Sequence, residues 1–101
     1  MATVSKVLFR GAATTSTGTT LYTTPAGSTA VVTNIVIENS AATTSTVTLA
    51  LNSVPIATAV PLGANSITVI DLKQSLPATQ TITGGASTTA VDIHISGVEI
   101  A

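Results

Sequence analysis

Apolar and polar side chains alternate along much of this sequence with a period of two, which is the pattern of β-strands that bury one face. In residues 45–51 the odd positions Val47, Leu49 and Leu51 are apolar, and the even positions between them are threonine or alanine. No stretch has the i, i+3, i+4, i+7 apolar spacing of an amphipathic helix. The pattern therefore predicts an all-β chain.

Short runs rich in Pro, Gly, Asn and Ser, which are typical of turns, separate the strand-like segments. The predicted strands are residues 3–10, 19–24, 29–39, 45–51, 54–60, 66–72, 79–83 and 88–100. This many short strands in 101 residues bury their apolar faces by forming two packed layers. We therefore expect a single small antiparallel β-sandwich, similar to a jelly roll, with about eight short strands.

For two of these segments the sequence also predicts a position within the sheet. Residues 29–39 are largely apolar on both faces between Val31 and Ile37, which predicts a central strand or one covered by a partner subunit. Pro55 has no N–H for a ladder hydrogen bond, so residues 54–60 are expected at the edge of a sheet.

The last predicted strand, 88–100, changes its phase before it ends. Its apolar residues lie on one face up to Ile95, whereas Val98 and Ile100 fall on the opposite face. A β-bulge inserts one extra residue and so exchanges the two faces of a strand. We therefore place a bulge at Ser96-Gly97, which would return the last two apolar residues to the core.

Low charge constrains the surface of this domain. Only 7% of the residues are charged, against about 25% in typical soluble domains. The sequence instead contains 21 Thr and 10 Ser, whose hydroxyl groups keep a half-exposed sheet hydrated. A weakly charged surface associates readily because little electrostatic repulsion opposes contact. The composition therefore favours a protein that assembles with others.

The composition also argues against several classes of function. A net charge of −1 with only two aromatic residues does not suit nucleic-acid binding. The absence of Cys excludes disulfides and thiolate metal sites. No apolar run approaches the length of about 20 residues of a membrane helix, and the start of the chain has no apolar signal region. We expect a chain made in a cytoplasm, with no nucleic-acid, membrane or small-molecule partner.

One row of polar residues raises the question of catalysis. Asp92, His94 and Ser96 alternate onto one face of the last predicted strand. Residues two apart on a strand stand roughly 6.5–7 Å apart, whereas a catalytic base must lie within about 3 Å of its nucleophile. Transition-metal sites usually need three or four ligands, and the chain has one His. We expect no enzyme, no catalytic or metal-binding residue and no cofactor.

The start of the chain is expected to be separate from the rest. Residues 1–18 form a predicted N-terminal arm, made of the first strand and a flexible, low-complexity loop, and residues 19–101 form the predicted sandwich domain. The loop contains Ala-Ala-Thr-Thr-Ser-Thr, which recurs at residues 41–46. The flanking residues do not match, so the recurrence reflects composition and not a duplication.

Four residues of this arm are candidates for binding a partner. Lys6 and Arg10 are expected on one face of the first strand, and Val7 and Phe9 on the other. A strand with a basic and an apolar face can dock on a neighbour by strand addition. It can equally be an edge strand whose positive charges prevent unwanted pairing. The sequence leaves both interpretations open.

Several short motifs resemble small β-sandwich proteins found in the virions of tailed bacteriophages. Residues 21–27 read Leu-Tyr-Thr-Thr-Pro-Ala-Gly and lead into the apolar strand 30–37, which is followed by Asn39. A strand pair at 47–51 and 56–60 and a closing Ile-Ser-Gly-Val complete the resemblance, which covers residues 19–100. That group usually has Gly after the Asn of the hairpin turn, where this chain has Ser53.

The resemblance implies a structural component of a virion with no catalytic residues. We expect a capsid decoration protein, also called a cement protein, that forms a homotrimer and binds the major capsid protein on the outer surface of the head. Its arm would dock on the shell or on a neighbouring copy. The alternative is a tail, baseplate or fibre module of the same fold that binds a host surface. The near absence of aromatic side chains argues against sugar binding in that role.

Overall fold

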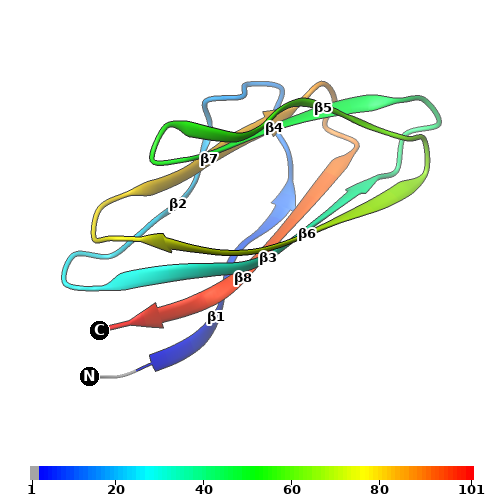
Figure 1. Ribbon diagram of the computed structural model, residues 1–101. Helices are drawn as coiled ribbons and strands as arrows, with labels where there is room; N and C mark the ends of the chain where they lie inside the picture. Colours follow the sequence, from blue (N-terminus) through cyan, green and yellow to red (C-terminus); the bar gives the residue numbers. More distant parts are fainter. Residues whose placement is uncertain (1–2) are drawn as a thin grey trace.

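The computed structural model describes residues 3–101, which form eight strands and no helix (Figure 1). The strands are β1 Thr3–Ala12, β2 Thr20–Thr23, β3 Thr29–Asn39, β4 Ser45–Leu51, β5 Val54–Leu62, β6 Ser66–Leu76, β7 Thr81–Ala86 and β8 Val91–Ile100. No helix in this part of the chain is long and apolar enough to cross a membrane. The predicted all-β class is confirmed.

The strands form two four-stranded sheets that pack face to face (Figure 1). The strand orders are β1-β8-β3-β6 and β2-β7-β4-β5, and the paired strands are antiparallel. The chain crosses between the sheets at every connection except the β4–β5 hairpin, which is the connectivity of a jelly roll. The predicted sandwich is therefore confirmed.

The core lies between the two sheets and receives alternate residues from both. Val47, Leu49 and Leu51 of β4 are buried, as their period of two predicted. They face a layer from the other sheet that includes the fully buried Ile35 and Ile95. Each such side chain contributes about 1.5–3 kcal/mol by leaving water. Without disulfides, this shared core is the main source of stability.

Two predictions about strand position are confirmed, whereas the bounds of every strand except β3 and β4 differ from the predicted ranges. β3 is a central strand, and β5 with its Pro55 is an edge strand. β6 continues to Leu76, and β7 runs through Gly84 and Gly85, where the sequence predicted a turn. A Cβ on Gly84 would clash with Leu49 and the backbone of Thr48, so glycine here allows close strand packing and does not end the strand.

The predicted bulge in β8 is wrong. β8 alternates without interruption, with Ile95 and Gly97 on its inner face. The extra residues belong to its two neighbours, at Leu8 in β1 and Thr33 in β3. A Cβ at position 97 would clash with the Val31 carbonyl and the Leu8 side chain, so this crowded crossing requires glycine. Val98 and Ile100 consequently stay on the outer face.

One buried polar side chain joins the two sheets at one end of the sandwich. Asn39, at the end of β3, is 1% exposed. Its amide donates to the carbonyls of Leu62 (3.2 Å) and Gly63 (3.0 Å), where β5 of the other sheet ends. Its Oδ1 accepts from the Ala41 amide (3.1 Å) and the Ser45 hydroxyl (3.3 Å), next to the start of β4. Asn39 therefore couples both sheets to the loop between them.

Candidate functional site

The four residues predicted to bind a partner lie on the edge strand β1, which is paired with β8 along its length. The loop that follows β1 contacts other strands: the Ala13 amide donates to the Val91 carbonyl (2.8 Å), and the Thr14 carbonyl accepts from the Ala86 amide (2.9 Å). Residues 1 and 2 of the predicted arm lie outside the described residues. A division into an arm at 1–18 and a sandwich at 19–101 stays a prediction.

The face assignment in β1 must be corrected. Lys6 and Phe9 pair with inner-face positions of β8, whereas Val7 and Arg10 pair with outer-face positions. The sequence pattern had placed Lys6 with Arg10 and Val7 with Phe9. The bulge at Leu8 adds one residue and exchanges the faces after it, which strict alternation does not reveal.

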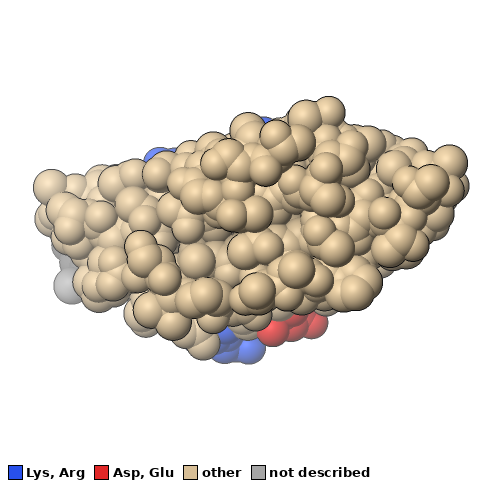
Figure 2. Space-filling model, turned by 90° about the horizontal axis from the view of Figure 1, so that it is seen from above, with Lys and Arg blue, Asp and Glu red and all other residues tan. Residues whose placement is uncertain are grey.

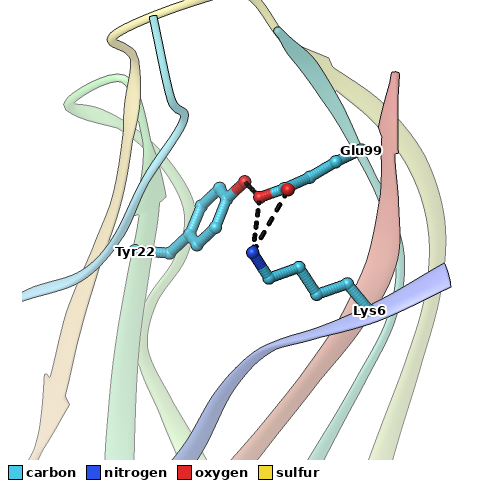
Figure 3. Close-up of polar contacts among 3 residues, drawn as sticks. All are labelled: Lys6, Tyr22 and Glu99. Atoms are coloured by element: carbon cyan, nitrogen blue, oxygen red, sulfur yellow. Dashed lines mark hydrogen bonds and ion pairs between the residues drawn. The ribbon is translucent and has the colours of Figure 1, made fainter. Parts of the chain in front are cut away.

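Lys6 belongs to a polar cluster that spans the gap between the sheets (Figure 3). Its Nζ lies 3.2 and 3.3 Å from the two carboxylate oxygens of Glu99 in β8. Tyr22, which comes from β2 in the opposite sheet, donates its hydroxyl hydrogen to the same carboxylate. The Glu99 side chain is 15% exposed and that of Lys6 is 47% exposed. We call these three residues the clasp.

The clasp keeps Glu99 ionised and Tyr22 neutral. The hydrogen bond from Tyr22 is the main cause that lowers the pKa of Glu99, and Lys6 lowers it further. Burial raises the pKa of Tyr22, and the neighbouring carboxylate raises it again. Sequence reasoning missed this cluster because its members lie far apart in the chain. The signal was present, however, since uninterrupted alternation in β8 puts Glu99 on the inner face.

The polar row of β8 lies on the outer face of its sheet, as predicted. Arg10 of β1 donates from Nε to Nδ1 of His94 at 3.1 Å. No hydrogen bond found in residues 3–101 joins any two of Asp92, His94 and Ser96. In the same range, no three His, Cys, Asp or Glu side chains are grouped to hold a metal ion. The row thus forms part of a polar sheet surface.

Charge is confined to one of the two sheets. The seven charged residues are Lys6 and Arg10 in β1, Glu38 in β3, Asp71 and Lys73 in β6, and Asp92 and Glu99 in β8. Strands β2, β7, β4 and β5 contain none. Figure 2 looks onto these four strands and shows a broad uncharged surface with blue and red atoms only at its rims. We call the sheet β2-β7-β4-β5 the uncharged sheet and the sheet β1-β8-β3-β6 the charged sheet.

No protein-family model and no curated protein sequence matches the chain. Among solved structures, an exo-β-1,3-galactanase from Phanerochaete chrysosporium with galactose matches 95% of this chain at 17% identity, with a TM-score of 0.46. A pentameric capsid protein isolated from metagenomic phage sequences matches 97% of it at 16% identity, with a TM-score of 0.38. The C-terminal domain of EclA, a sugar-binding protein, matches 96% of it at 17% identity, with a TM-score of 0.36.

These matches concern only part of each protein. The chain spans 29% of the galactanase, 60% of the capsid protein and 75% of the EclA chain, so it covers less than two thirds of the first two. Similarity at this level carries no argument about function, which has to come from the sequence and surface of the chain itself.

Proposed function

We propose that the protein is a structural component of a tailed-bacteriophage virion, namely a capsid decoration protein that binds the outside of the major capsid shell and stabilises it. The resemblance of residues 19–100 to small virion β-sandwich proteins supports this class. The proposal about the binding surface rests on one observation. All seven charged residues lie on one sheet, and none lies on the other.

The uncharged sheet is the surface that can be dehydrated at the lower free-energy cost. Burying a charged group without a partner costs far more than burying a hydroxyl that finds a hydrogen bond. Thr46 and Thr83 lie on its outer face, between the buried residues of their strands. Such hydroxyls hydrate this face in the free protein and can pair with backbone groups of a bound shell. We therefore assign the uncharged sheet to the capsid.

The charged sheet suits exposure to water. Asp92 of β8 and Glu38 of β3 are directly opposite each other on its outer face. Like charges in this position repel each other and destabilise a sheet, an effect that water screens and a dry interface would strengthen.

Asp92, His94 and Ser96 also stand along one strand and do not converge on a common point. We propose no catalytic activity for this surface.

The proposal can be tested with capsids assembled from the major capsid protein of the same virion. The purified protein should sediment with these capsids, saturate at a fixed number of copies and raise the temperature at which the shell breaks. Electron microscopy of gold-labelled protein on intact virions should show label on heads. Label confined to tails would support the tail or fibre alternative, and no binding to either would overturn a virion role.

A further inference from the structure

The exposed apolar side chains are confined to strands at the edges of the sheets. In the described part of the chain, the large apolar residues with high exposure are Val4 and Val7 in β1, Val54, Ile56 and Val60 in β5, and Ile67 and Val69 in β6. β1 and β6 are the two edges of the charged sheet, and β5 is one edge of the uncharged sheet. The central strands contribute none of these seven residues.

These edge strands define two opposite sides of the sandwich. β5 and β6 follow one another in the chain, contact each other and carry five of the seven residues (Figure 1). β1 contacts β2 at the other side and carries the remaining two. We call these the β5–β6 side and the β1 side. Both sides expose apolar surface that a soluble edge strand usually avoids.

The β5–β6 side is shaped for packing of side chains and not for strand addition. Pro55 and Pro61 cannot donate ladder hydrogen bonds, and Ala59 has a φ of 47°, which interrupts the extended backbone. β5 has no charged residue, and β6 has none before Asp71, although Glu38 of β3 lies directly opposite Ile67. A contact here would therefore be driven by burial of valine and isoleucine side chains.

We infer that the β5–β6 side of one copy packs against the β1 side of a second copy, in a head-to-tail contact. A two-fold contact between two β5–β6 sides would leave out the β1 side with Val4 and Val7, whereas a head-to-tail contact uses both apolar sides. The sandwich is 46 Å long and 18–21 Å across, so one long side offers the area of about 800 Å² per partner that stable interfaces need. Repeated contacts of this kind form a ring when the rotation between copies closes, and an open filament when it does not.

The inference deepens the proposed function, on which it rests, by naming the contact between copies. Two variants test it in free protein by light scattering. Val69→Asp blocks the β5–β6 side and Val7→Asp blocks the β1 side, at positions that are 56% and 44% exposed and have no acidic residue directly opposite, so both variants should fold. We expect an oligomer for the wild type, monomers for each variant alone, and dimers, but nothing larger, for their equimolar mixture, since each variant keeps one working side.

A matched control adds the same charge elsewhere. Thr89→Asp lies in the exposed loop between β7 and β8 and should keep the mass of the wild type. Thermal melting of all three variants confirms that they fold. A monomeric wild type at every concentration, a monomeric mixture, or a Val7→Asp protein with wild-type mass would overturn the inference. Capsid binding is measured separately, so failure here is distinguishable from failure of the decoration role.

Discussion

The two sheets bury equivalent inner faces but present very different outer faces. Ile35 in the charged sheet and Leu49 in the uncharged sheet are both 0% exposed, and both belong to one core. Every charged side chain nevertheless belongs to the first of these sheets. The difference teaches that folding constrains the inner alternation of a sandwich, while the outer positions are free to serve contact with water or with a partner.

The largest expected effect tests whether both sheets depend equally on this core. Ile35→Ala and Leu49→Ala should each lower the free energy of unfolding by about 2–5 kcal/mol, because each leaves a cavity where a full side chain was packed. Urea denaturation measures both values. Thr46→Ala on the outer face serves as the control and should change stability by less than about 0.5 kcal/mol. A much smaller loss for Leu49→Ala would show that the uncharged sheet contributes less to folding.

A somewhat smaller effect is expected at the polar joint between the sheets. Asn39→Ala removes the partner of the Leu62 and Gly63 carbonyls and of the Ala41 amide, and should cost about 1–3 kcal/mol. The same denaturation experiment measures it. Asn34→Ala, on the outer face of the same strand, is the matched control and should cost clearly less. Equal losses for the two variants would argue against a joint at Asn39.

The clasp should contribute less to the free energy of unfolding than the hydrogen bonds of Asn39. Tyr22→Phe removes the hydrogen bond to Glu99 without changing the ring, and should lower stability at neutral pH by about 1 kcal/mol. Lys6→Ala removes only a half-exposed partner, so its cost should be smaller. Thermal melting at pH 7 compares the two. A larger loss for Lys6→Ala would show that the ion pair dominates the clasp.

The clasp also predicts how stability depends on pH. The folded-state pKa of Glu99 is lowered, so its contribution is complete above the unfolded value of about 4.3 and is lost as the pH falls through the folded value. Melting temperatures measured from neutral pH down to about pH 3 should therefore fall less steeply in Glu99→Gln than in the wild type. Parallel curves for the two proteins would contradict this contribution.

The smallest effect on stability should come with a large effect on binding. Thr83→Lys puts a charge on the outer face of the uncharged sheet, and Ser75→Lys puts the same charge on an exposed position of the charged sheet. Both should change unfolding free energy by less than about 0.5 kcal/mol. Only Thr83→Lys should weaken sedimentation with capsids, because its ammonium group would have to be dehydrated in the contact. Equal binding by both variants would contradict the assignment of the uncharged sheet to the capsid. Weaker binding by Ser75→Lys alone would reverse this assignment.

Much of this architecture could be predicted from alternation and turn residues. The bounds of β3 and β4 coincide with the predicted ranges 29–39 and 45–51. The Asn52-Ser53 turn joins the predicted strands 45–51 and 54–60, and its φ angles of 49° and 65° are those of a type I′ hairpin without glycine. Local patterns succeed at such places because the inner face and the turn are specified by neighbouring residues.

The surface features were harder to predict because they depend on pairing between distant strands. The bulges at Leu8 and Thr33 lie beside the crowded backbone of Gly97, and the sequence of neither strand shows this crowding by itself. Lys6 was singled out, but its partners Tyr22 and Glu99 were not, because only the sandwich brings them together. The confinement of charge to one sheet likewise required the strand order.

An uncharged contact face has a consequence for the conditions under which a shell stays covered. Dissolved ions screen interactions between exposed charges over about 8 Å at physiological ionic strength, whereas the burial of apolar groups does not depend on this screening and is strengthened by salts that are excluded from protein surfaces. A contact made through β2, β7, β4 and β5, which contain no Asp, Glu, Lys, Arg or His, should therefore hold in dilute fresh water and in brine alike. Under the proposed function, the protein would therefore remain attached to its shell in both kinds of solution.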